Sequence, residues 1–368
     1  METLVIPRRL EIIRAYKAHG GNVAAVLPIH YPRALLRAFD ILPVEVWGPP
    51  RVDPTQGSAH LQPYVCSIVR NALAYLLDGK LDVADFIVVP HTCDSLQGFA
   101  SILIDFVKPT QPVLPIYVPR GRRMSDLYFL RDEFKSLYHT LASLTQRQPS
   151  DADLLSAIER EEQADHLLAQ LHQNRQTIAL SQFDLYRLIR AREYLPAETF
   201  IEIVGAILAV AHNGHAQGVP RQTPILLSGI VPEPLTLFDA LTQMNAYVVA
   251  DDFAACGRRL YPPGSREDLF ERMAERILLA PPDSTRGSPM EERLEHLVTL
   301  AQTTGARGIV FYDVKFCEPE LFYLPVLREG LQRANLPSVV IEFDLNDGLT
   351  QQTQTRLEAF VEMIGGRQ

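Results

Sequence analysis

Short apolar runs alternate with segments of helical periodicity in two separate parts of the chain. The predicted strands of the first part span residues 22–27, 44–47, 86–90 and 113–118. Its predicted helices span residues 10–19, 32–39 and 96–107, and a further predicted helix begins at residue 66. Strands that alternate with helices favour parallel pairing and right-handed crossovers, so we expect an α/β domain over residues 1–125.

The second part repeats this outline without repeating the sequence. Its predicted strands span residues 224–229, 247–250, 308–312 and 339–343. Its predicted helices span residues 234–244, 290–304, 320–334 and 353–364. Between the two parts no strand is evident, and apolar residues such as Leu154, Leu155 and Ile158 recur at helical spacing. We therefore expect a helical connecting segment over residues 126–215 and a C-terminal α/β domain over residues 216–368.

Composition narrows the class of protein. Hydrophobic residues make up 47% of the 368 residues and charged residues 21%, which is typical of a globular protein. The formal net charge is −9 and no long basic run is present, so nucleic acid is not expected as a partner. The N-terminus lacks a signal-peptide core and no apolar run reaches membrane-spanning length. We expect a soluble, cytoplasmic protein that does not bind membranes.

Three of the four cysteines lie where a strand or loop should turn into a helix. Cys93 and Cys317 follow predicted strands in the two α/β parts, and Cys66 opens a predicted helix. Ligands of parallel sheets bind beyond the carboxyl ends of the strands, and helix N-termini favour thiolates. A single free cysteine is more often a small buried hydrophobic residue. The shared placement nevertheless favours a buried metal or iron–sulfur site at one crevice.

Motifs that are absent exclude several other classes. No Cys-x-x-Cys pair is present, which disfavours zinc and a ferredoxin pattern. The signatures of dinucleotide dehydrogenases, P-loop ATPases, α/β-hydrolases and zincins are also missing. Cys256 lies in a predicted loop, where packing alone would explain it.

Several polar residues leave two interpretations open. Asp251 and Asp252 fit a catalytic or cation-binding pair about as well as a solvated turn capped by carboxylates. His30, His91 and Arg258 lie near predicted strand ends and would face the crevice, although each alone is more often a surface or core-edge residue. The turn at residues 346–348 is more typical of a surface turn than of a loop near a site.

Six segments, taken in order, resemble one family. They are residues 27–48 (LPIHYPRALLRAFDILPVEVWG), 66–70 (CSIVR), 89–95 (VPHTCDS), 248–252 (VVADD), 314–319 (VKFCEP) and 355–363 (TRLEAFVEM). Over nearly its whole length, the chain resembles the 2-hydroxyacyl-CoA dehydratase family of the 2-hydroxyglutaryl-CoA dehydratase D-component type. That family includes the core subunits of ATP-dependent benzoyl-CoA reductase.

The resemblance implies two Rossmann-like or flavodoxin-like domains with one [4Fe–4S] cluster in the crevice between them. It matches the three ligating cysteines to Cys66, Cys93 and Cys317 and leaves the fourth iron position open. It also implies a heterodimer with a related second subunit and an ATP-dependent iron–sulfur activator that supplies a low-potential electron. In the dehydratases this electron reduces an acyl-CoA thioester to a ketyl radical anion, which expels the hydroxyl group. In the reductases it goes to an aromatic ring.

Two departures from the family pattern bear on the site. Cys256 falls later after Asp252 than expected, so we do not assign it as a ligand. Asp40 stands where the family tends to have small residues, and we expect it to alter the mouth of the site. No residue is assigned as a catalytic acid or base. The interpretations that remain are a dehydratase-like subunit, a benzoyl-CoA reductase-like subunit, a non-catalytic electron-relay or structural subunit, and a redox or sulfur-handling protein on the same scaffold.

Overall fold

Two four-stranded parallel sheets form the framework of the protein. The computed structural model describes residues 4–49, 52–213 and 222–366. The first sheet has the strand order β2-β1-β3-β4, and the second has the equivalent order β6-β5-β7-β8. The first sheet comprises β1 (Asn22–Val26), β2 (Ile41–Glu45), β3 (Phe86–His91) and β4 (Val113–Tyr117). The second comprises β5 (Thr223–Gly229), β6 (Ala246–Phe253), β7 (Gly308–Val314) and β8 (Ser338–Phe343). The predicted α/β fold with two parallel sheets is confirmed.

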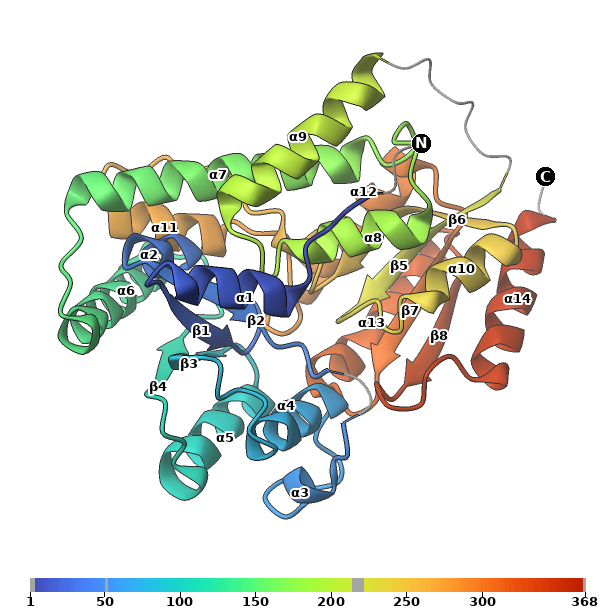
Figure 1. Ribbon diagram of the computed structural model, residues 1–368. Helices are drawn as coiled ribbons and strands as arrows, with labels where there is room; N and C mark the ends of the chain where they lie inside the picture. The colour runs from blue at the N-terminus through green and yellow to red at the C-terminus, as the bar shows by residue number, and fades with distance from the viewer. Residues whose placement is uncertain (1–3, 50–51, 214–221, 367–368) are drawn as a thin grey trace.

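Helices cover both sheets and connect them. The first sheet is accompanied by α1 (Arg9–Ala18), α2 (Arg33–Ala38), α3 (Thr55–Ser58), α4 (Ser67–Leu77), α5 (Asp94–Ile102) and the π-helical turn η1 (Leu103–Val107). The connecting helices are α6 (Met124–Thr145), α7 (Asp151–Gln173), α8 (Gln182–Ala191) and α9 (Ala197–Asn213). The second sheet is accompanied by α10 (Thr236–Gln243), the 3₁₀ turn η2 (Gly257–Arg259), α11 (Leu269–Leu278), α12 (Met290–Thr304), α13 (Glu318–Arg333) and α14 (Gln351–Gly365). In Figure 1, α7, α8 and α9 run along one side of the molecule, past both sheets.

A shared hydrophobic core joins the two halves. The largest cluster of buried side chains includes Ala25 from the first sheet, Tyr186 from α8 and Val310 from the second sheet. A second cluster lies on the opposite face of the first sheet, where α11 packs against α6 although the two helices are far apart in sequence. The chain therefore crosses between the halves more than once, and the predicted boundaries at residues 125 and 215 remain predictions.

Of the eight strands in the described part of the chain, β2 and β6 depart most from their predicted ranges, each for a physical reason. β2 begins at Ile41 and includes Pro43, whereas the predicted strand began after this proline. Proline lacks a backbone N–H, but β2 is an edge strand, where this loss is tolerated. β6 continues through Asp251 and Asp252 to Phe253, because both carboxylates are paired inside the protein.

Helix α11 was not among the predicted elements. Asp268 caps its N-terminus by accepting hydrogen bonds from the backbone N–H groups of Phe270 and Glu271. Its apolar positions Met273, Ala274 and Ile277 are buried, as expected for an amphipathic helix. The cap and this spacing were visible in the sequence, but the many charged residues between them concealed the pattern.

Candidate functional site

Three cysteines directly precede the first residues of three helices. Cys66 precedes α4, Cys93 precedes α5 and Cys317 precedes α13. Cys93 follows β3 and Cys317 follows β7, and these two strands hold the same place in the orders of the two sheets. Parallel sheets bind ligands beyond the carboxyl ends of such strands. The predicted placement of all three thiols at the ends of elements is confirmed.

The three thiols act on one another electrostatically, which places them in one part of the molecule. Burial raises the pKa of each thiol, that of Cys93 to about 12. After burial, Cys66 contributes most to the raised pKa values of both Cys93 and Cys317. Cys93 also raises the pKa of Cys317. Since Cys317 belongs to the second sheet and the other two cysteines to the first, the thiols meet at the junction of the two halves.

Backbone N–H groups at the helix starts act in the opposite direction. Those of Ile68 and Val69 lower the pKa of Cys66, and those of Ser95 and Leu96 lower the pKa of Cys93. The first turn of a helix offers unpaired N–H groups and the positive end of the helix dipole, both of which favour a nearby anion. Burial still dominates, so the thiols by themselves are neutral at pH 7 and would need a bound cationic centre to become thiolates.

The cysteines are not arranged for a single metal ion. Within residues 4–49, 52–213 and 222–366, no group of three or more His, Cys, Asp or Glu side chains could hold one ion. Thiolates on one zinc ion each lie about 2.3 Å from it and are therefore close together. In a cluster of several irons each thiolate binds a different iron atom, so the sulfur atoms lie further apart.

A set of polar contacts fixes the start of α4 to the second half of the chain. Arg70 donates to the Asp344 carboxylate at 2.9 Å. Asn71 and Asn346 exchange two hydrogen bonds of 3.0 Å between their side-chain amides. The Ser67 hydroxyl accepts from the backbone N–H of residue 345 at 3.3 Å. The turn at residues 346–348 was predicted to be a surface turn, but Asn346 instead helps to hold the helix that begins after Cys66.

A cavity of about 170 Å³ opens beside Cys93. Its wall includes Thr92, Ser284, Thr285 and Arg120. Thr92 is only 4% exposed, and its hydroxyl has no hydrogen-bond partner among the described residues. The hydroxyl of Thr285 is likewise buried without a described partner. Buried polar groups are normally satisfied, so these hydroxyls indicate a place where a polar ligand or water binds.

The paired acids form internal ion pairs. Asp251 accepts from Arg175 at 2.9 Å and from the Tyr186 hydroxyl at 2.8 Å. Asp252 accepts from Arg258 at 3.1 Å and from Arg293 at 2.6 Å. Both carboxylates are buried. The solvated turn is therefore wrong, and the arginines that surround both groups leave no place for a bound cation.

Arg258 and His30 belong to a buried network that the sequence only partly indicated. Arg258 is fully buried and donates to Asp283 at 3.1 Å and to Glu320 at 2.6 Å. His30 contacts the other oxygen of Asp283 at 3.0 Å. Asp283 and Glu320 were not predicted site residues, although the position of Glu320 in the first turn after Cys317 was a usable signal. The network connects the loop after β1 with the helix that begins after Cys317.

Glu45 is a second connection that was not predicted. Its carboxylate is fully buried and accepts from the Tyr31 hydroxyl and from the Trp47 indole, each at 2.9 Å. It also pairs with Arg33 and with Arg259, which belongs to the second half of the chain. A carboxylate between the apolar residues of a predicted strand was the signal that could have identified it.

Three other predicted residues lie in different surroundings. His91 is partly buried, and its ring lies edge-on to Tyr117 with 4.5 Å between the ring centroids. Cys256 is fully buried in the main core, and burial raises its pKa most, followed by Asp251. Asp40 precedes β2 and so lies at the amino end of the sheet, opposite to Cys93, where it accepts from Tyr16 at 2.6 Å. The expectation that Asp40 alters the mouth of the site is therefore wrong.

Comparison with known proteins decides the family. The family model described as "2-hydroxyglutaryl-CoA dehydratase, D-component" matches residues 28–364, which is nearly the whole chain. The chain belongs to the 2-hydroxyglutaryl-CoA dehydratase D-component family. The resemblance stated from the six sequence segments is confirmed.

Relatives within the D-component family are subunits of acyl-CoA enzymes. The chain is 23% identical to the (R)-phenyllactyl-CoA dehydratase beta subunit of Clostridium sporogenes, over 96% of this chain and 94% of that protein. It is 25% identical to the (R)-2-hydroxyglutaryl-CoA dehydratase subunit beta of Acidaminococcus fermentans, over 96% and 95%. It is 24% identical to a benzoyl-CoA reductase subunit of Thauera aromatica, over 93% and 91%. These relatives include both dehydratases and a reductase, all of them named as single subunits of an enzyme.

Two further observations complete the description of this D-component protein. Among the residues described, no helix is both long and apolar enough to cross a membrane. The donor set at the domain junction fits an anionic iron–sulfur cluster, because three free thiols meet where helix N-termini offer N–H groups.

Proposed function

We propose that this chain is the iron–sulfur subunit of a 2-hydroxyacyl-CoA dehydratase-like enzyme, and that Cys66, Cys93 and Cys317 hold a [4Fe–4S] cluster. The observation that carries the proposal is the meeting of three thiols, two of them on buried residues and one on a partly buried residue, from three helix starts at the junction of the two halves. When bound, such a cluster supplies transfer of a low-potential electron to an acyl-CoA thioester, together with an open iron position.

The residues around the cysteines would then hold and insulate this group. Backbone N–H groups of α4 and α5 stabilise the negative charge of the ligating thiolates. The contact between Arg70 and Asp344 keeps Cys66 in position relative to the second half of the chain. Burial of Cys66 and Cys317 to 6% and 7% exposure excludes water from two of the three ligands.

The substrate side of the proposal rests on the cavity beside Cys93. The unpartnered hydroxyls of Thr92 and Thr285 are suited to bind the thioester carbonyl or the hydroxyl group of a 2-hydroxyacyl-CoA, whereas the Ser284 hydroxyl already donates to Glu320. Arg120 lies at the same cavity, but it pairs with Asp94 at 3.7 Å, and Glu318 also lines the wall, so the charges at this cavity do not select for an anionic ligand. With about 170 Å³, the cavity accommodates an acyl end but not a whole coenzyme A ester, since pockets for drug-sized ligands measure roughly 300–1,000 Å³.

The same small volume favours a second candidate function, that of an electron-relay or structural subunit. In that case the acyl-CoA would bind to the partner subunit, and this chain would only pass the electron on. A benzoyl-CoA reductase-like role is a further alternative, supported by the similarity to one of the subunits of that enzyme. The names of the relatives support a related partner subunit, as in a heterodimer, and the proposed chemistry calls for an ATP-dependent activator. The free thiols suit the reducing cytoplasm.

Electron paramagnetic resonance of the full chain separates these functions. After anaerobic reconstitution with iron and sulfide and reduction by dithionite, we expect the signal of one reduced [4Fe–4S] cluster. Addition of a 2-hydroxyacyl-CoA to the chain alone should change this signal if the substrate binds here. An unchanged signal would support the relay function, whereas the absence of any cluster signal would contradict both.

A further inference from the structure

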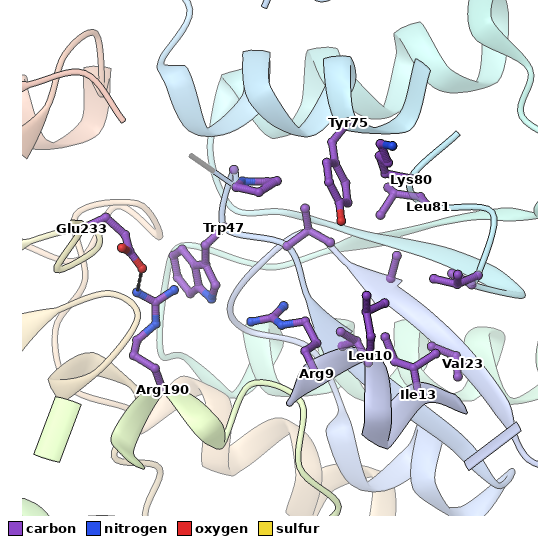
Figure 2. A pocket seen from close by; sticks show the side chains of 17 residues that line it. Arg9, Leu10, Ile13, Val23, Trp47, Tyr75, Lys80, Leu81, Arg190 and Glu233 are labelled. Carbon is purple, nitrogen blue, oxygen red and sulfur yellow. Dashed lines mark hydrogen bonds and ion pairs between the residues drawn. The ribbon is translucent and has the colours of Figure 1, made fainter. Parts of the chain in front are cut away.

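A second and larger cavity lies away from the three cysteines. It measures about 280 Å³ and is enclosed by α1, α4 and the face of the first sheet. Figure 2 shows its walls, which are mainly apolar and include Leu10, Ile13, Val23 and Leu81. Arg190 from α8 and Glu233 from the loop after β5 close one end. Three parts of the chain therefore meet here, as is common for ligand sites at domain junctions.

Most charges at this cavity already have partners. Arg190 pairs with Glu233 at 2.8 Å, the contact drawn in Figure 2. Arg9 pairs with Glu193 at 2.8 Å and lies over the ring of Tyr194. Carboxylates therefore neutralise these two guanidinium groups. The paired arginines form part of the cavity wall, and their charges do not by themselves favour an anionic ligand.

Two hydrogen-bond donors remain at the cavity. Neither the Lys80 ammonium group nor the Tyr75 hydroxyl has a hydrogen-bond or ion-pair partner within residues 4–49, 52–213 and 222–366. In Figure 2 the Tyr75 ring extends from α4 into the cavity, with its hydroxyl toward α1, and Lys80 lies beside the ring, nearer to α4 than to the hydroxyl. Lys80 is exposed and Tyr75 is partly buried, so the cavity has a solvated ammonium group at its rim and a hydroxyl donor inside. An apolar interior with these two donors is complementary to an apolar molecule that ends in negatively charged or carbonyl oxygen atoms.

We propose that this cavity binds a small apolar carboxylic acid or the corresponding acyl group of a thioester. The hydrocarbon or aryl part occupies the apolar interior, and its terminal oxygen atoms meet Lys80 and Tyr75. The volume is sufficient for a phenyl ring with a short side chain but not for coenzyme A, which would remain outside. None of the three cysteines lines this cavity, so the site stands whether or not the chain holds a cluster.

The chain contains its own reporter for this site. Trp47 lines the cavity and is the only tryptophan among the 368 residues. Titration of the full chain with 3-phenylpropanoate should therefore give a saturable change in tryptophan emission, with matching heat in calorimetry. The neutral analogue 3-phenylpropanamide should bind roughly two- to fivefold more weakly, the range expected for one solvent-accessible ion pair. No emission change and no heat with either compound would overturn the proposal.

Variants test the two parts of the site separately. Lys80→Met should remove the preference for the carboxylate over the amide, whereas Lys108→Met, at an exposed lysine outside the cavity, should retain it. Tyr75→Phe should lower the affinity for both the carboxylate and the amide by roughly fivefold, as expected for one lost hydrogen bond. Ala84→Phe fills the cavity and should abolish the emission change. Unaltered preference in Lys80→Met, together with unaltered affinity in Tyr75→Phe, would contradict the proposal even if Ala84→Phe does not fold.

The source of the ligand is distinguished by a third compound. If 3-phenylpropanoyl-CoA binds at least tenfold more tightly than the free acid and competes with it, the cavity holds the acyl end of a coenzyme A thioester. If only the free acid binds, the cavity is a site for a free carboxylic acid. Both outcomes support the apolar acyl site, whereas binding of the thioester that leaves Trp47 emission and free-acid binding unchanged would count against it.

Discussion

Arg70, one turn after Cys66, donates to the Asp344 carboxylate at 2.9 Å, and Asp344 directly follows the strand β8 of the other sheet. Both side chains are about 15% exposed, so water screens the pair less than a surface ion pair. The pair therefore ties the helix that begins after Cys66 to the half of the chain that carries Cys317. The position of one proposed ligand thus depends on a contact far from it in sequence.

Asp344→Asn should weaken the contact with Arg70 that keeps Cys66 in position, without unfolding the protein. In protein loaded with iron, we expect a chelator to remove the iron roughly fivefold faster, which corresponds to about 1 kcal/mol for a partly buried pair. Glu329→Gln provides the control, because it removes an exposed ion pair with Arg333 on α13. Equal rates of iron release in wild type and Asp344→Asn would show that the contact does not position Cys66.

Gly48 should be intolerant of any side chain. Its φ is +69°, and an added Cβ would lie 2.5 Å from the Ile68 Cα in the first turn of α4. Gly48→Ala therefore combines backbone strain with a steric clash, and we expect a loss of roughly 3 kcal/mol in the free energy of unfolding. Gly20→Ala separates the two effects, since Gly20 has φ of +85° with no atom within 4 Å of the added Cβ. That variant should lose only about 1 kcal/mol in a urea titration. Similar losses in both variants would exclude the clash.

His172 should make the protein less stable in mild acid. Burial lowers its pKa in the folded state to about 4, and Arg175 donates to its Nδ1 at 2.7 Å, which requires the neutral ring. In the unfolded chain the ring takes up a proton near pH 6.5, so the unfolded state gains protons first as the pH falls. The contribution of His172 to the free energy of unfolding is fully present above pH 6.5. About 3 kcal/mol of this contribution is lost as the pH falls from 6.5 to 4.

His172→Gln should remove this part of the acid sensitivity. Free energies of unfolding, measured by urea titration from pH 7 to pH 4, should decline less in the variant than in the wild type by about the same 3 kcal/mol. The variant loses the ring at all pH values, so the comparison concerns the slope with pH and not the absolute stability. Parallel pH dependence in the two proteins would show that His172 is not held neutral.

The order of strands and helices was accessible from the sequence because apolar runs and helical spacing report burial locally. Cys93 and Cys317 were therefore correctly placed after β3 and β7, and Cys66 at the start of α4. The contacts that bring these elements together were not accessible. Asp344 and Asn346 contact residues of α4 that lie 274 and 275 positions earlier in the chain, and only the three-dimensional arrangement reveals this pairing.

Charged residues gave the least reliable predictions. Asp252, Arg258 and Glu320 are buried, although charged residues ordinarily indicate a surface. Each is compensated by partners from distant segments, and this compensation has no local signature. Asp40 was assigned to the mouth of the site because it departs from the family pattern, but its place before β2 puts it at the opposite end of the sheet.

The iron content of cysteine variants tests the central claim most directly. Wild-type protein reconstituted and desalted without oxygen should contain about four iron atoms per chain, the number in one [4Fe–4S] cluster. Cys66→Ser, Cys93→Ser and Cys317→Ser should each lose most of this iron, while Cys256→Ser, which alters a thiol buried in the main core, should retain it. An iron-free wild type, or full iron content in any of the first three variants, would contradict the account.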